Sequence, residues 1–283
     1  MKKPSLGMLL ILSLWMSFAA PVSFAHIPPG EFVVRNLAQK KLPFRSIRVK
    51  TQVVALGEGS PGGLGFRETT WFDASTGTVR SRAYDEAGHE LFSIERKLSA
   101  EEVKLSPATR MIRLLFSSNP VNLQRELVAA GIPVQPETEK KPSLLRWRET
   151  VAWVFGGPQR SAEEKLAIRS GSPASGTSPE LWIEKDTFLP LRIVAQVGTQ
   201  WLDATFEGYR FYKDFPFPKT IRLSRDGLPM IQVDQQDVAV GAEVASELKK
   251  PLNVGQTGGL TAAGQAASEE IRSLIQMYYE WMR

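Results

Sequence analysis

The residues that could do acid–base or metal chemistry are few. The chain has two histidines, His26 and His89, and no cysteine. Without thiols there is no disulfide, zinc–thiolate site, iron–sulfur cluster, cysteine nucleophile or lipidated N-terminal cysteine. Hydrolytic and metal-dependent chemistry usually relies on histidine. The sequence therefore favours a protein that binds a ligand over an enzyme, and we expect no cofactor and no metal site.

Both histidines still allow an alternative. An N-terminal histidine can bind copper, and His26 would become the first residue if the chain is cleaved after Ala25, but a copper site of this kind needs a second histidine side chain. Only His89 remains, in a predicted turn between charged strands. No G-x-S-x-G motif is present, so a hydrolase would have to use His89 as its base. An extracytoplasmic hydrolase is thus the weakest of our hypotheses.

The acidic motifs indicate exposed surface, and the glycine-rich motif indicates a turn. Neighbouring glutamates on a helix point about 100° apart and cannot easily share one metal ion. This applies to Glu101-Glu102, Glu163-Glu164 and Glu269-Glu270. Residues Gly57–Gly62 match G-x-G-x-x-G, but a dinucleotide site needs a helix directly after the glycines, and a strand pattern follows here. We expect a hairpin loop and no nucleotide.

The first 25 residues resemble an export signal. Lys2 and Lys3 precede an apolar run, Leu6–Ala20, which is short against the roughly 20 residues needed to span a bilayer. Ser23 and Ala25 are small at the positions that a signal peptidase reads. We predict cleavage after Ala25 and an exported, periplasmic chain from His26, with an uncleaved anchor as the alternative.

Periodicity predicts a mostly β chain. Helices are expected at Glu31–Lys41 and from Asn119-Pro120 to Gly131, where asparagine can cap and proline suits the first helical position. Alternating residues predict strands from Ser46 and at Phe66–Asp73, Thr78–Tyr84, Glu90–Lys97, Leu145–Phe155, Leu181–Glu184, Leu191–Gln196, Trp201–Tyr212, Lys219–Ser224 and Met230–Asp237. Links this short make neighbouring strands antiparallel.

The predicted fold class is α+β and mostly β: a single curved antiparallel sheet, an unclosed half-barrel, with a few helices covering its concave face. We divide the chain into a signal peptide (1–25), a half-barrel domain (26–250), and a flexible linker with a C-terminal amphipathic helix (251–283). That helix, Ser268–Arg283, has apolar residues at helical spacing. Docking on the parent domain is its simpler interpretation.

An apolar concave face with few helices over it could hold a hydrophobic ligand. Strand alternation places the candidate lining residues on one face: Phe92, Ile94, Val151, Trp153, Phe155, Leu191, Ile193, Leu202 and Phe206. A register error of one residue would turn a strand's set outward. Most of the arginines at intervening positions (Arg80, Arg82, Arg146, Arg148, Arg192, Arg210 and Arg222) are expected to be solvated outer-face charges, and we expect no nucleic-acid partner.

Two short patterns near the end of the half-barrel domain resemble a known family. They are a strand followed by D-x-x-L-P-L-R, and a later Y-x-x-Y-x-x-F-P-x-P-x-x-I. Their residues are Asp186, Leu189-Pro190-Leu191-Arg192, Tyr209, Tyr212, Phe215, Pro216, Pro218 and Ile221. They resemble the LolA/LolB-like periplasmic outer-membrane lipoprotein carriers. The resemblance implies an unclosed half-barrel whose helix-covered concave face takes acyl chains.

Our leading hypothesis is therefore a soluble periplasmic carrier of lipids or acylated lipoproteins, involved in outer-membrane lipoprotein sorting and touching membranes only transiently. The alternative is an envelope stress sensor or assembly factor of the same fold, which binds a protein partner through its C-terminal helix.

Overall fold

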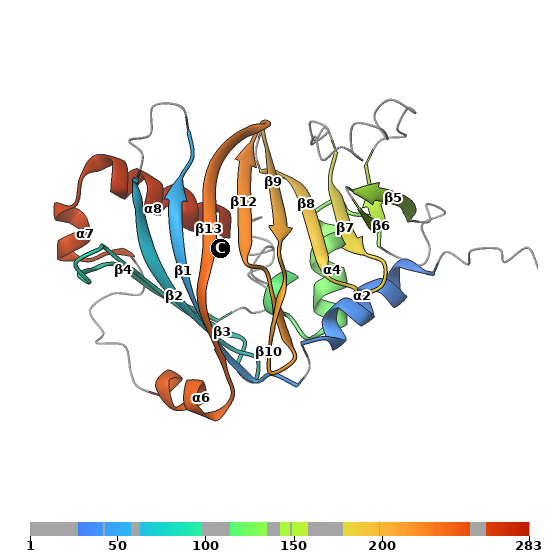
Figure 1. Ribbon diagram of the computed structural model, residues 1–283, viewed down its shortest axis with the longest axis horizontal. Helices are drawn as coiled ribbons and strands as arrows, with labels where there is room; N and C mark the ends of the chain where they lie inside the picture. The colour runs from blue at the N-terminus through green and yellow to red at the C-terminus, as the bar shows by residue number, and fades with distance from the viewer. Residues whose placement is uncertain are drawn as a thin grey trace, which may run out of the picture.

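A computed structural model describes residues 28–41, 43–57, 63–97, 114–134, 142–147, 149–157, 178–197, 199–249 and 259–282 (Figure 1). The predicted signal peptide, with His26, lies outside these residues, as do Glu101-Glu102 and Glu163-Glu164. Within the described ranges one sheet has twelve strands in the order β14-β4-β3-β2-β1-β13-β12-β9-β8-β7-β6-β5. Neighbouring strands are antiparallel. Among the described strands, the edges β14 and β5 do not pair with each other, so the sheet is open, as predicted.

The strands range from two residues in β14 to thirteen in β13 and are joined mainly by tight turns. Their bounds are β1 Ser46–Ala55, β2 Gly65–Asp73, β3 Thr78–Tyr84, β4 Glu90–Lys97, β5 Ser143–Trp147, β6 Thr150–Gly156, β7 Glu180–Glu184, β8 Pro190–Val197, β9 Gln200–Glu207, β12 Thr220–Arg225, β13 Leu228–Val240 and β14 Gly259–Leu260. A separate hairpin pairs β10 (Arg210–Tyr212) with β11 (Phe215–Phe217). The expected single strand Trp201–Tyr212 is therefore two strands, interrupted at Gly208, whose φ is +64°.

Two helices cover the concave face at the β6–β8 end of the sheet (Figure 1). These are α2 (Gly30–Gln39) and α4 (Pro120–Ala129). The Asn119 side chain caps α4 by accepting from the Val121 and Asn122 amides at 3.0 and 3.1 Å, which confirms the predicted helix start. At the start of α2, a side chain on Gly30 would lie 3.1 Å from the Phe155 ring. This close approach seats α2 against β6.

The C-terminal segment covers the other half of the concave face. In Figure 1, α8 (Glu269–Met282) runs behind β2, β1 and β13. Before it come β14, the edge strand, which pairs with β4, and α7 (Ala262–Ala266). Part of the segment expected as a flexible linker is thus a strand and a helix. Among the described helices, none is long and apolar enough to cross a membrane.

The convex face has a small core of its own. Trp182, Ala152 and Val154 are buried there, with Leu145, Trp147 and Leu191 packed against them. Arg192 is only 1% exposed and pairs with Asp203, its Nε lying 2.8 Å from Oδ1. Its guanidinium lies 5.4 Å from the centre of the Trp147 ring. Arg192 is therefore an exception to the expectation of solvated outer-face arginines, because aromatic side chains and a carboxylate cover it.

Arg80 is a second buried arginine on the convex side. It is 8% exposed and donates to Glu95 at 2.8 Å and to the Leu248 carbonyl of α6 (Ala242–Leu248). The same helix supplies Glu247, which accepts from the Trp71 indole at 2.7 Å. Arg210 and Arg222 are exposed, as predicted. A helix that the sequence analysis did not identify therefore covers part of the outer face.

Candidate functional site

A small cavity lies between the sheet and the C-terminal helix. We call it the central cavity, and its volume is about 30 Å³. Its floor comes from β1, β2, β12 and β13 and consists of Val49, Thr51, Glu68, Thr70, Ile221 and Val233. Its roof consists of Leu115, Phe116, Phe217 and Tyr278. One water molecule occupies about this volume in the liquid, whereas sites for small organic ligands are roughly 300–1,000 Å³.

Aromatic rings close the cavity on one side. Leu114, Leu115 and Phe116 form a buried helical turn over the sheet. The Phe116 ring stacks at 5.4 Å from Phe72 and at 5.9 Å from Phe217, measured between ring centres. Stacked rings of this kind pack densely and leave little free space. This part of the roof belongs to the structural core.

The apolar side of α8 closes the cavity on the other side. Leu274, Ile275, Tyr278 and Tyr279 are all buried. The Tyr279 ring stacks on Phe92 with 4.2 Å between centres, and the Tyr278 ring meets Phe66 edge-on at 5.5 Å. The described outward positions Ser273 and Gln276 are polar and exposed. The amphipathic helix is thus docked on its own sheet, filling the hollow that it covers.

One carboxylate lies inside this apolar surrounding. Glu68 is 5% exposed, and its Oε2 accepts a hydrogen bond of 2.6 Å from the Tyr278 hydroxyl. Thr51 lies opposite Glu68 on the neighbouring strand, and its hydroxyl has no hydrogen-bond partner in the described part of the chain. The candidate site is therefore an apolar hollow with an acceptor and a free hydroxyl in its floor.

Most of the predicted lining residues do face the concave side. Trp153, Phe155, Ile193, Leu202 and Phe206 are buried in the main core. Phe92 packs on Tyr279, and Ile94 is buried opposite Ser81. Val151 alternates with Trp153 and is half-buried. None of these residues lines the central cavity, whose walls come from other residues of the sheet, from the turn Leu114–Phe116, from Phe217 and from Tyr278.

Leu191 is the exception among the predicted residues. It packs on the convex side with Trp182, away from Ile193. The pairing of β7 with β8 shifts register between Trp182 and Ile183, so that Ile183 pairs with Pro190 and Leu191 is skipped. Such a bulge breaks strict alternation. The expectation that Leu191 shares a face with Ile193 is therefore wrong.

The sequence analysis did not identify Glu68, Thr51 or Tyr278 as site residues. In the strand Gly65–Asp73, both alternating sets mix polar and aromatic residues: Phe66, Glu68, Thr70 and Phe72 on one face, and Arg67, Thr69 and Trp71 on the other. A glutamate between inward phenylalanines is the one available signal. It becomes readable only when the register with the neighbouring strand is known.

Two larger hollows, each of about 270 Å³, lie elsewhere. One lies between the β2–β3 turn and the start of α4, where serine, threonine and asparagine side chains surround it. The other, lined partly by Leu191 and Phe206, also has Glu184 and Glu207 in its wall. Hydroxyl, amide and carboxylate groups in these walls make both hollows unsuited to a hydrocarbon chain.

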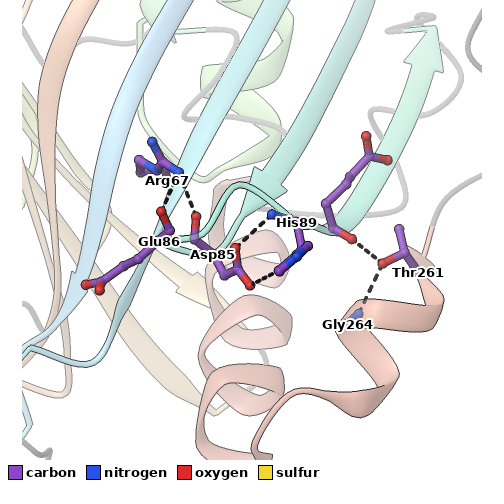
Figure 2. A network of polar contacts seen from close by, with 7 residues as sticks. Arg67, Asp85, Glu86, His89, Thr261 and Gly264 are labelled. Atoms are coloured by element: carbon purple, nitrogen blue, oxygen red, sulfur yellow. Dashed lines mark hydrogen bonds and ion pairs between the residues drawn. The ribbon is translucent and has the colours of Figure 1, made fainter.

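His89 forms hydrogen bonds with Asp85 in the turn between β3 and β4. Figure 2 shows its ring beside Asp85, with Nδ1 2.8 Å from Oδ2, and Arg67 bound to the Asp85 and Glu86 carbonyls. The hydrogen bond from His89 lowers the pKa of Asp85 below its usual range. Both side chains are solvent-exposed. Among the described residues, no three His, Asp or Glu side chains gather as metal ligands would.

No protein-family model matches this chain, and no curated protein matches it in sequence. The solved structures that are similar to it include the following three. A LolA superfamily protein from Nitrosomonas europaea is 11% identical, with a TM-score of 0.44 over 76% of this chain and 94% of that one. A DUF1329 family protein from Desulfovibrio piger is 10% identical, with a TM-score of 0.38 over 75% and 91%. An outer membrane lipoprotein-sorting protein domain from Vibrio parahaemolyticus is 10% identical, with a TM-score of 0.39 over 77% and 97%.

Proposed function

We propose that this protein binds the acyl chains of lipids or lipoproteins on the concave face of its sheet, and that it acts as an exported carrier in outer-membrane lipoprotein sorting. The observation that supports the proposal is the apolar face under α8, which is covered by a helix at the end of the chain and encloses the central cavity. No covalent chemistry is required for such a carrier.

The size of the central cavity requires α8 to move. A volume of about 30 Å³ holds a water molecule but no acyl chain. Withdrawal of α8 would uncover Phe66 and Phe92, which its tyrosines contact at rest. We infer that α8 and the ligand occupy the same apolar surface in turn.

The free energy that is lost when α8 leaves the sheet and the free energy that is gained when an acyl chain binds there are of similar size. Exposing Leu274, Ile275, Tyr278 and Tyr279 costs about 6–12 kcal/mol, at about 1.5–3 kcal/mol for each side chain. An acyl chain of about twelve methylenes regains about 10 kcal/mol, at about 0.8 kcal/mol each. Because the two terms nearly balance, a lipid can replace the helix without unfolding the sheet.

The connection of α8 to the sheet suits such a movement. Its N-terminal side is held at the sheet edge, where β14 pairs with β4 and the Thr261 amide donates to the Leu91 carbonyl at 2.9 Å. Ala267 and Ser268 separate α7 from α8. The helix can therefore swing about this junction while β14 stays paired.

Binding of a fluorescent long-chain acyl probe to the full chain tests the proposal. In the variant Leu274→Ser/Ile275→Ser the helix docks more weakly, so the binding-competent state is more populated and the apparent affinity should rise at least about tenfold. The matched control Ser273→Ala/Gln276→Ala changes only exposed positions of α8 and should bind as the wild type does. Failure of the probe to bind wild type and loosened variant alike contradicts the proposal.

The alternative, a sensor or assembly factor whose C-terminal helix binds a protein, uses the same movement. The apolar side of α8 is buried at rest, so it could contact a partner only after leaving the sheet. Deletion of Ser268–Arg283 separates the two functions: a carrier keeps lipid binding, whereas a sensor loses its partner.

A further inference from the structure

Three polar side chains interrupt the apolar floor of the central cavity. Thr51, Glu68 and Thr70 are each more than nine-tenths buried, and Thr51 and Glu68 lie directly opposite each other on β1 and β2. The Thr70 hydroxyl lies 2.9 Å from that of Ser81 and is thus satisfied. The Thr51 hydroxyl has no partner among the described residues. Burying such a group costs free energy unless a ligand or a water bonds to it.

Tyr278 shows what kind of group this floor accepts. Its side chain is an apolar ring with a hydroxyl at the tip, and this hydroxyl donates to Glu68 at 2.6 Å while the ring packs on Phe66. An ionised carboxylate can only accept hydrogen bonds. When α8 withdraws, Glu68 loses this donor in an apolar surrounding. A ligand that brings a donor of its own removes that penalty, and a ligand without one does not.

This inference rests on the proposed function and names the class of lipid that the site takes. We propose that Glu68, with Thr51 beside it, selects lipids that carry a hydroxyl or an amide N–H on or next to the acyl chain. That donor takes the place of the Tyr278 hydroxyl on Glu68, and the Thr51 hydroxyl binds a neighbouring polar atom of the same lipid. Free fatty acids are disfavoured, because two carboxylates close together repel each other in a poorly solvated site.

Three probes of equal chain length isolate the donor. 1-Dodecanol and 1-methoxydodecane differ in one hydrogen-bond donor, and dodecanoate adds a negative charge. Each competes with the fluorescent acyl probe on the full chain. We expect the alcohol to bind at least about tenfold more tightly than the ether, since hydrogen bonds to charged groups are among the stronger ones, and dodecanoate to bind most weakly.

Variants assign the selectivity to the two ends of the hydrogen bond. Glu68→Leu should bind the alcohol and the ether equally. Tyr278→Phe keeps the ring on α8 but removes the competing hydroxyl, so the alcohol should bind more tightly than it does to the wild type. Glu68→Gln preserves the shape of the side chain, and it should raise the affinity for dodecanoate by removing the charge. Thr69→Ala, on the opposite face of β2, is the matched control and should change nothing.

The outcomes separate the two proposals. Equal affinities of wild type for alcohol and ether, or a preference that survives in Glu68→Leu, overturn the selectivity while leaving acyl binding in place. Failure of every probe to bind, in the α8-loosened variant too, overturns the proposed function and this inference with it.

Discussion

Lys41 is a charged residue whose role depends on burial. It follows α2, is 2% exposed, and donates through Nζ to the carbonyl of Leu114, which lies in the helical turn that roofs the sheet. Burial lowers the pKa of this lysine to about 7. The residue therefore links α2 to the roof at a free-energy cost that varies with pH.

The free-energy cost of burying Lys41 falls as the pH rises, so the free energy of unfolding should increase with pH. Between about pH 7 and the ordinary lysine pKa near 10.5, the unfolded chain binds a proton at Lys41 that the folded chain does not, so the free energy of unfolding increases with pH. From pH 7 to pH 9 wild type should gain about 2 kcal/mol relative to Lys41→Met in urea unfolding. The exposed neighbour variant Lys40→Met should behave as wild type. If the free energy of unfolding changed with pH in the same way for wild type and Lys41→Met, the lowered pKa of the buried Lys41 would be contradicted.

Arg192 and Asp203 form the best-buried ion pair described on the convex face, with side chains 2% and 14% exposed. Asp203→Ala leaves the guanidinium buried without its carboxylate and should lower the free energy of unfolding by about 3–5 kcal/mol. The double variant Arg192→Met/Asp203→Leu should lose less free energy of unfolding than Asp203→Ala does. Glu207→Ala, which breaks the more exposed pair with Arg222, should cost at most about 1 kcal/mol. Equal losses in Asp203→Ala and Glu207→Ala would contradict this account.

Among the elements, α7 and β14 hold the C-terminal segment to the sheet. Figure 2 shows Thr261 beside Gly264, whose amide donates to the Thr261 hydroxyl at 3.1 Å. That hydroxyl also donates to the Glu90 carbonyl. A side chain on Gly264 would lie 1.9 Å from the Leu91 carbonyl oxygen, closer than atoms can approach. Glycine is therefore required where α7 meets β4.

Gly264→Ala should release this attachment. We expect amide hydrogen exchange to accelerate over residues 259–282, while β1, β12 and β13 keep their protection, because the central ladders do not involve α7. Ala263→Ser, at an exposed position of the same helix, is the control. Unchanged exchange in β14 and α8 would show that α7 does not hold them.

The elements also show how far the sequence predicts the structure. The strands predicted from alternation and turn residues at Phe66–Asp73, Thr78–Tyr84 and Glu90–Lys97 are correct, because local sequence patterns determine strands that are joined by tight turns. Leu191 was misplaced because its bulge depends on pairing with a distant strand. The site around Glu68 was missed for a similar reason: Tyr278 lies 210 residues away in sequence, and no local pattern connects them.

At the scale of the whole molecule, the open sheet has two covers of different kinds. α2 and α4 lie within the chain and pack on β6–β8, whereas α8 lies at its end and packs on β1 and β2 (Figure 1). α2 and α4 also pack on each other, whereas α8 is joined to the sheet edge through β14 and α7. The proposed function assigns the opening movement to the half of the concave face under α8.

Hydrogen exchange of the full chain with and without a bound single-chain lysophospholipid tests this account most directly. If the lipid replaces the helix, amides of residues 269–282 exchange faster in the complex, while those of β1 and β2 keep or increase their protection. A complex in which α8 stays as protected as in the free protein would contradict the account, because the lipid would then lie elsewhere.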